Sequence, residues 1–213
     1  MPELRRQLIE TARRMAPANL NRGAAGNLSV RAREQDEDGY LITPSGMDYD
    51  VLVPDDIVFM RLDGTADGRR KPSSEWRLHH DVYATRPEAG AVLHAHSPFA
   101  TSLACLRRDI PPFHYMIARF GGDNVRCADY ATFGTQALSD GAIAALEGRR
   151  ACLLANHGML VLGGDLRSTL ALAVEFETLC EQYWRACQLG APVLLSATEM
   201  AEVLVKFSGY GQQ

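Results

Sequence analysis

The chain of 213 residues has the composition of an ordinary single domain with a sizeable core, since 46% of its residues are hydrophobic and 23% are charged. Its net charge of -4 and its scattered basic residues argue against a nucleic-acid partner, and no segment approaches the roughly 20 apolar residues that span a membrane. These features favour a small-molecule partner and a cytoplasmic location.

The first half of the sequence predicts a helix, a hairpin and a second helix. An amphipathic helix is expected over residues 3–18, before the glycine-rich stretch NRGAAGN. Strands are expected over residues 28–31 and 40–43, with QDEDG as their turn, and again within DDIVFMRLDG. A helix over residues 74–85 follows, because KPSSEW combines serines and an early glutamate as helix starts do.

The second half alternates short strands with helices. Apolar side chains at helical spacing predict one long helix over residues 166–187, whose buried face includes Cys180 and Cys187. Because strands occur in hairpins as well as between helices, we expect one α/β domain of the α+β type over residues 1–213, with a central, mainly antiparallel sheet flanked by helices. The other expected elements are strands over 91–96 and 125–128, helices over 98–106, 135–146 and 197–207, and two strands joined by a tight turn at 156–158.

The segment AVLHAHSPF carries two histidines one residue apart at the end of a predicted strand. Residues i and i+2 of a strand point to the same face, so His94 and His96 can offer their imidazoles to one metal ion. The alternative is two unrelated polar residues, because a chelate needs a further ligand. His157 in ANHGML is the natural third ligand, since packing explains a histidine between Asn and Gly at a turn poorly. Three imidazoles with an open position are typical of catalytic zinc sites.

Other polar residues keep two interpretations. Glu75 is either a capping residue favoured by the helix dipole or a metal ligand and general base. We assign His79 and His80, on the same helix, to no site, because such a pair more often makes surface or core contacts. Three turns or caps can bind an anion through backbone N–H groups, although each alone is more often structural: Gly26-Asn27, Ser45-Gly46 and Ser73-Ser74.

The sequence resembles the class II aldolase/adducin family through the ordered set GNLSV, LITPSGMDY, KPSSEW, LHAHSPFATSLA, HYMIARFGG, ATFGT and ANHGML, which covers nearly the whole chain. The resemblance implies a homotetramer in which Tyr115 acts catalytically in the site of a neighbouring subunit. It also implies one Zn²⁺ per subunit on His94, His96, His157 and Glu75, with Glu75 as acid and base. The positions that match the family's phosphate site are Gly26, Asn27, Ser45, Gly46, Ser73 and Ser74, and those at the aldehyde end are Phe133 and Tyr210.

The implied activity is the reversible cleavage of a ketose 1-phosphate, such as L-fuculose 1-phosphate, into dihydroxyacetone phosphate and a small aldehyde such as lactaldehyde. Zinc would act as a Lewis acid, and a low-dielectric pocket would raise the pKa of Glu75 towards the working pH. Alternatives are an aldolase for 5-deoxyribulose or 5-methylthioribulose 1-phosphate, a methylthioribulose-1-phosphate dehydratase, or an adducin-like binding module. The family's epimerases have aspartate at the position of Glu75, which weighs against epimerisation.

The chain departs from the family pattern in places that we expect near the site entrance. Asn156 stands where such an aldolase has a second histidine, and Arg119-Phe120 replaces smaller residues. These side chains would change which aldehyde the site accepts, and Phe120 would suit an apolar one.

Overall fold

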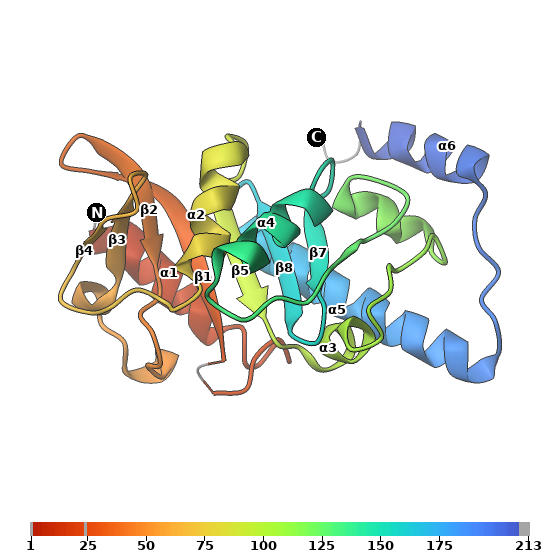
Figure 1. Cartoon of the computed structure of the whole chain (residues 1–213), viewed down its shortest axis with the longest axis horizontal. Coiled ribbons are helices and arrows are strands. Elements are labelled where there is room, and N and C mark those ends of the chain that lie inside the picture. The colour runs from red at the N-terminus through yellow and green to blue at the C-terminus, as the bar shows by residue number, and fades with distance from the viewer. Residues whose placement is uncertain (1, 24, 209–213) are drawn as a thin grey trace.

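The computed structural model describes residues 2–23 and 25–208, and one mixed sheet runs through it (Figure 1). Within these ranges the sheet has eight strands in the order β4-β3-β2-β1-β5-β8-β7-β6, and all neighbours are antiparallel except β6 and β7. The mainly antiparallel sheet confirms the expected fold class. The strands are β1 (Gly26–Glu34), β2 (Glu37–Ile42), β3 (Val58–Arg61), β4 (Ala66–Asp67), β5 (Ala91–Ala95), β6 (Cys127–Ala128), β7 (Ala151–Leu154) and β8 (Gly158–Gly163).

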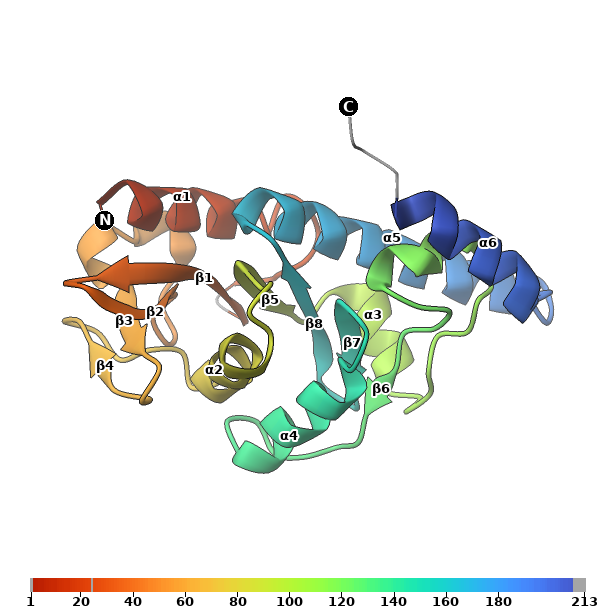
Figure 2. The ribbon, with the colours of Figure 1, turned by 90° about the horizontal axis from the view of Figure 1, so that it is seen from above.

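Helices cover both faces of the sheet, with α1 and α5 on one face and α2 and α4 on the other (Figure 2). Short 3-10 helices occupy stretches where no helix was predicted. Among the described residues, no helix has both the length and the apolar character that a membrane span requires. The helices are α1 (Pro2–Arg13), α2 (Trp76–Thr85), α3 (Pro98–Ala104), α4 (Gln136–Ala145), α5 (Leu166–Leu189) and α6 (Ala197–Ser208), with 3-10 helices η1 (Tyr49–Val51), η2 (Pro54–Asp56) and η3 (Tyr115–Phe120).

Side-chain alternation along β1 and β5 decides which residues face α2. Leu28 and Val30 point into the core beneath α1 and α5. Asn27 and Ser29, at the intervening positions, therefore face α2. Asn27 pairs directly with His94 across the β1-β5 ladder, so these two polar side chains share the α2 face. The fold thus gathers polar residues from two neighbouring strands under one helix.

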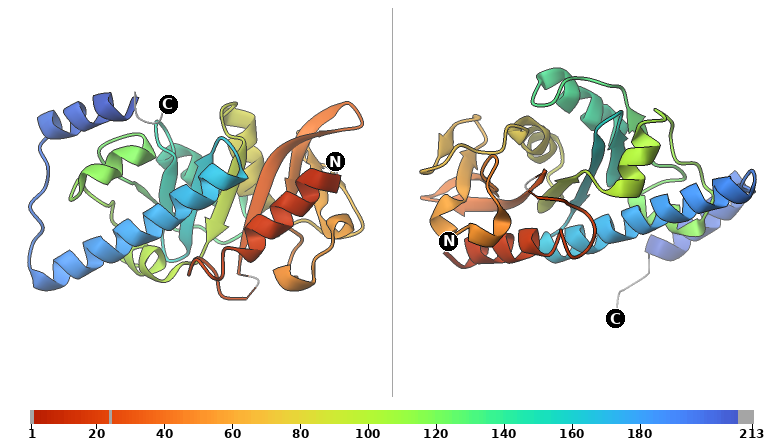
Figure 3. Two further views of the ribbon diagram at one scale, coloured as in Figure 1. Left: turned by 180° about the vertical axis from the view of Figure 1, so that it is seen from behind. Right: turned by 90° about the horizontal axis from the view of Figure 1, so that it is seen from below.

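The long helix α5 extends past the body of the domain (Figure 3). Its inner face is buried as far as Cys180, but Cys187 is exposed and Leu189 is 92% exposed. The predicted burial of Cys187 is therefore wrong, because helical spacing continues after the surface that covers it has ended. The first helix also ends earlier than expected, at Arg13, and irregular turns follow it.

Candidate functional site

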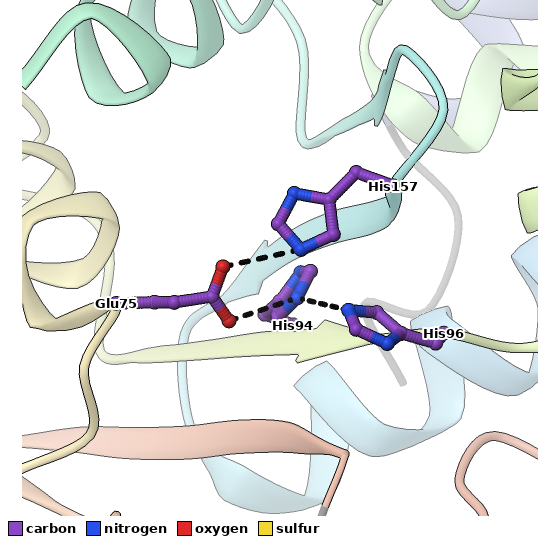
Figure 4. Close-up of side chains that lie close together, drawn as sticks. All are labelled: Glu75, His94, His96 and His157. Carbon is purple, nitrogen blue, oxygen red and sulfur yellow. Dashed lines mark hydrogen bonds and ion pairs between the residues drawn. The ribbon is translucent and has the colours of Figure 1, made fainter. Parts of the chain in front are cut away.

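Four side chains from three segments converge on one point at the end of β5 (Figure 4). Glu75 stands at the N-cap of α2, His94 lies on β5 with His96 just beyond its end, and His157 occupies the turn between β7 and β8. One ligand atom from each lies within 4.8 Å of the others. The carboxylate oxygens of Glu75 lie 3.2 Å from His94 Nε2 and 3.1 Å from His157 Nε2, and the Nε2 atoms of His94 and His96 are 3.0 Å apart.

The hydrogen bonding of the cluster fits a metal ion. His94 Nδ1 lies 2.9 Å from the Met159 carbonyl oxygen, which accepts only, so Nδ1 donates and Nε2 is left with its lone pair. That lone pair is directed at His96 and Glu75. A cation between these nitrogen and oxygen atoms would bind to all of them and remove the repulsion between their lone pairs. Three imidazoles and a carboxylate form a donor set that suits zinc and also accepts neighbouring divalent metals. The predicted ligands thus lie where one ion could bind all four.

Gly158 explains how His157 reaches the cluster. A side chain at Gly158 would place its Cβ 2.4 Å from the Ala95 carbonyl oxygen and 2.9 Å from the His96 ring. Only glycine therefore lets β8 pass so close to the end of β5. This close approach brings the His157 turn beside His94 and His96.

The ligand cluster determines the charge state of Glu75. Burial alone would raise the pKa of this carboxyl group, but in the metal-free chain the imidazoles of His94 and His157, when protonated, hold it well below its ordinary value through charge and hydrogen bonding. The expected rise in the pKa of Glu75 is therefore wrong for this arrangement, because both carboxylate oxygens face ring nitrogens. Partial burial lowers the pKa of His96 to about 4, and the neighbouring imidazoles of His94 and His157 contribute less to the same shift. His96 is then neutral near pH 7, as a metal ligand must be.

A cavity of about 440 Å³ opens onto the cluster and collects most of the predicted site. The loops around it are tied together, because the Ser45 N–H donates to the Lys71 carbonyl oxygen at 3.1 Å and the Ser73 N–H to that of Thr43 at 3.1 Å. The cavity is lined by all six predicted phosphate residues, Gly26, Asn27, Ser45, Gly46, Ser73 and Ser74, together with Glu75, His96, His157 and Phe133. The structure thus brings the two predicted groups into one cavity.

The far wall of the cavity contains residues that sequence reasoning missed. Phe133 was expected there and is 66% exposed, but Tyr130 and Ala131 join it. Asn156, which was expected near the site entrance, also lines the wall, and its side-chain oxygen accepts a hydrogen bond of 2.6 Å from Arg107 Nε. Ala131 is the first residue of the ATFGT motif that marked Phe133 and Tyr130 directly precedes it, so considering the whole motif and one residue before it would have found both.

Two further predicted residues lie elsewhere. Tyr115 on η3 is 50% exposed and stacks on Phe207, with 6.4 Å between ring centroids, away from the cavity of its own chain. Phe120 is fully buried and packs on Phe176, with 5.0 Å between centroids, so its expected position at the site entrance is wrong. The inward side of η3 directs Phe120 into the core. Tyr210 lies outside the described residues.

His79, which sequence reasoning assigned to no site, is fully buried behind Glu75. Its Nε2 lies 2.5 Å from Asn27 Oδ1 and its Nδ1 lies 2.6 Å from Ser29 Oγ. The only sequence signal was its position one turn after Glu75 on the same helix.

Both the sequence and the fold match proteins of one family. The family described as Class II Aldolase and Adducin N-terminal domain matches residues 6–184. The chain belongs to this family. It is 56% identical to a 5-methylthioribulose-1-phosphate/5-deoxyribulose-1-phosphate aldolase of Rhodospirillum rubrum, over 98% of this chain and 92% of that protein. It is 44% identical to the L-fuculose phosphate aldolase of Escherichia coli (strain K12), over 98% of this chain and 96% of that protein.

A solved structure of an L-fuculose 1-phosphate aldolase superimposes on this class II aldolase with a TM-score of 0.92 and 41% identity, covering 98% of this chain and 97% of the other. The chain is therefore an enzyme, a carbon-carbon lyase, and not the adducin-like binding module left open by the sequence. Class II aldolases are metal-dependent, which agrees with the four-ligand cluster.

Proposed function

We propose that this aldolase reversibly cleaves a ketose 1-phosphate into dihydroxyacetone phosphate and a small aldehyde, with one zinc ion per subunit. One observation carries the proposal: a single cavity holds the predicted phosphate residues, the Glu75 carboxylate and the imidazoles of His96 and His157. A phosphate at one end of this cavity would place the adjoining carbons of a short sugar beside Glu75. The aldolase names of the relatives support the same substrate class.

The phosphate end would bind its ligand through serine hydroxyls and through backbone N–H groups other than those of Ser45 and Ser73, which donate to Lys71 and Thr43. Ser73 and Ser74 directly precede Glu75, the N-cap of α2, and the ten residues of α2 direct the positive end of the helix dipole at this part of the cavity. Ser45 and Gly46 lie on the neighbouring loop. Binding energy from the phosphate would position the reacting carbons, which lie farther along the chain.

Glu75 would move the proton at the carbon that becomes nucleophilic. Glu75 is 7% exposed, its carboxylate lies beside the imidazoles of His94 and His157, and it follows Ser74 directly, so the reacting carbon would lie close to the phosphate. When bound, the metal ion supplies Lewis-acid stabilisation of the negative charge that develops on the substrate oxygens. His94, His96 and His157 would hold that ion throughout, and Glu75 would hold it until the substrate displaces its carboxylate.

The aldehyde end would lie against Tyr130, Ala131 and Phe133. The rings of Tyr130 and Phe133 and the methyl group of Ala131 present carbon surface, which suits a methyl or methylthio group. We therefore place 5-deoxyribulose and 5-methylthioribulose 1-phosphate before L-fuculose 1-phosphate as substrates, which reverses the order expected from the sequence. The 56% identity to a relative named for these two ketoses supports this order.

The proposed active unit is a homotetramer in which Tyr115 completes the site of a neighbouring subunit. The side chain of Tyr115 is half exposed and lies away from the cavity of its own chain, as a residue that acts in another subunit must. There it would give a proton to the oxygen of the aldehyde fragment in the synthetic direction. Tyr210 would line the aldehyde end.

Product analysis tests the proposed reaction. The zinc-loaded protein should release dihydroxyacetone phosphate and an aldehyde in equal amounts from 5-deoxyribulose and 5-methylthioribulose 1-phosphate, with lower kcat/KM on L-fuculose 1-phosphate. A dehydratase would instead convert 5-methylthioribulose 1-phosphate into one dehydrated diketone without any three-carbon product. That product would replace the aldolase assignment.

A further inference from the structure

A continuous chain of buried hydrogen bonds begins at Glu75 and runs beneath α2. Asn27 Nδ2 donates to Glu75 Oε2 at 3.0 Å, and Asn27 Oδ1 lies 2.5 Å from His79 Nε2. Ser29 Oγ lies 2.6 Å from His79 Nδ1 and 2.8 Å from the Tyr83 hydroxyl. All five side chains are buried, so none of these bonds can be replaced by bulk water.

The chain arises from matching repeats in a strand and a helix. Asn27 and Ser29 are two residues apart on β1, which spans roughly 6.6 Å, and both face α2. His79 and Tyr83 are four residues apart on α2, which spans roughly 6 Å, and share one helix face. The strand pair and the helix pair therefore lie opposite each other in register.

The charge on Glu75 determines the direction of every bond. An ionised carboxylate only accepts, so Asn27 must turn its NH₂ group towards Glu75 and its oxygen towards His79. His79 Nε2 then carries the proton, and Nδ1 accepts from Ser29, whose oxygen accepts from Tyr83. Burial, with a smaller contribution from His94, lowers the pKa of His79 to about 3, so the ring stays neutral at working pH. Only one tautomer of His79 satisfies the whole chain.

We propose that His79 is a positioning residue that acts on Glu75 through Asn27. By donating to Asn27 Oδ1, His79 keeps the amide nitrogen, and not the amide oxygen, against the Glu75 carboxylate. Asn27 then aims Glu75 Oε2 at the ligand cluster and stabilises its ionised form. The Asn27 side chain thus hydrogen-bonds to Glu75 and also lines the predicted phosphate site.

The catalytic consequence rests on the proposed role of Glu75. Exchange of the dihydroxyacetone phosphate proton with D₂O, followed by proton NMR on the zinc-loaded protein, isolates the step assigned to Glu75. His79→Leu should slow this exchange about tenfold or more with KM little changed, whereas His79→Gln, whose amide can still donate to Asn27, should recover most of the rate. His80→Leu, at the adjacent position of α2 outside the chain of bonds, should leave it unchanged.

A double-mutant cycle separates positioning from general packing. If His79 acts through Asn27, the double variant His79→Leu/Asn27→Ala should be no slower than Asn27→Ala alone. Rate losses that multiply, or a Gln variant as slow as the Leu variant, would overturn the proposal.

Two further measurements do not depend on catalytic turnover. They can therefore test the role of His79 even if the proposed aldolase reaction is wrong. Nitrogen-15 NMR of the unmodified protein should show His79 protonated at Nε2 and unprotonated at Nδ1, and the opposite tautomer would overturn the bond directions. Zinc affinity of the metal-free chain should fall about tenfold in His79→Leu and stay unchanged in His80→Leu, since groups that orient a ligand are worth roughly 10 to 100-fold in affinity. Equal affinities would show that His79 does not act on Glu75.

Discussion

Buried neutral His79 should make the stability of this aldolase depend on pH. The perturbation is acidification from pH 7 to pH 5, compared between the unmodified chain and His79→Gln. The pKa of His79 is lowered from 6.5 to about 3 by burial, so below pH 6.5 the unfolded chain binds a proton here that the folded chain does not. Stability is therefore lost as the pH falls, by about 1.4 kcal/mol per pH unit. The interval between pH 6.5 and pH 5 gives about 2 kcal/mol.

Urea unfolding of the metal-free protein at pH 7, 6 and 5, followed by circular dichroism, measures this loss. The unmodified chain should lose about 2 kcal/mol more over this range than His79→Gln, which cannot titrate. Tyr83→Phe is the matched control, because it also removes one buried bond from the same chain but keeps the imidazole, and it should lose as much as the unmodified protein. Parallel curves for the unmodified chain and His79→Gln would refute the reasoning.

Three substitutions examine the rest of the site. Glu75→Gln should keep the fold and reduce turnover about 100-fold or more, and undiminished turnover would remove Glu75 as the proton carrier. His94→Ala should lose stoichiometric zinc by elemental analysis while His80→Ala retains it, and full occupancy in the first would contradict the ligand assignment. Glu177→Leu should lower the unfolding free energy by about 3 kcal/mol, because the buried carboxylate accepts three hydrogen bonds where α3 begins, just after His96. Glu175→Leu, whose ion pair with an arginine is partly exposed, should lose about 1 kcal/mol or less, and equal losses would count against the capping role.

The cluster that could hold a metal ion was predictable in part, because its three histidines follow local rules. Strand alternation alone places His94 and His96 on one face, and a histidine between Asn156 and Gly158 has few structural explanations. What no periodicity reveals is that β8 lies beside β5, which brings His157 to the pair. The joint motif pattern supplied that step, and the structure supplied its cause in the missing side chain of Gly158.

The predictions for His79, Phe120 and the pKa of Glu75 failed because each depends on contacts between residues far apart in the sequence. His79 looked like an ordinary helix residue because its partners, Asn27 and Ser29, come from a strand about 50 residues earlier, and only the register of α2 on β1 joins them. Phe120 was expected near the site entrance because of the motif around it, whereas a turn of η3 directs its side chain into the core. The direction of the Glu75 pKa was misjudged because burial was considered without the two imidazoles that face the carboxylate.

Metal reconstitution tests the central claim most directly. Zinc is added back in steps to chelator-treated protein, and dihydroxyacetone phosphate release from 5-deoxyribulose 1-phosphate is measured for the unmodified chain and for His157→Ala. Activity should rise with zinc and level off at one ion per chain in the first, and should not return in the second. Full activity in the metal-free protein, or equal recovery in His157→Ala, would contradict a metal-dependent aldolase built on these four ligands.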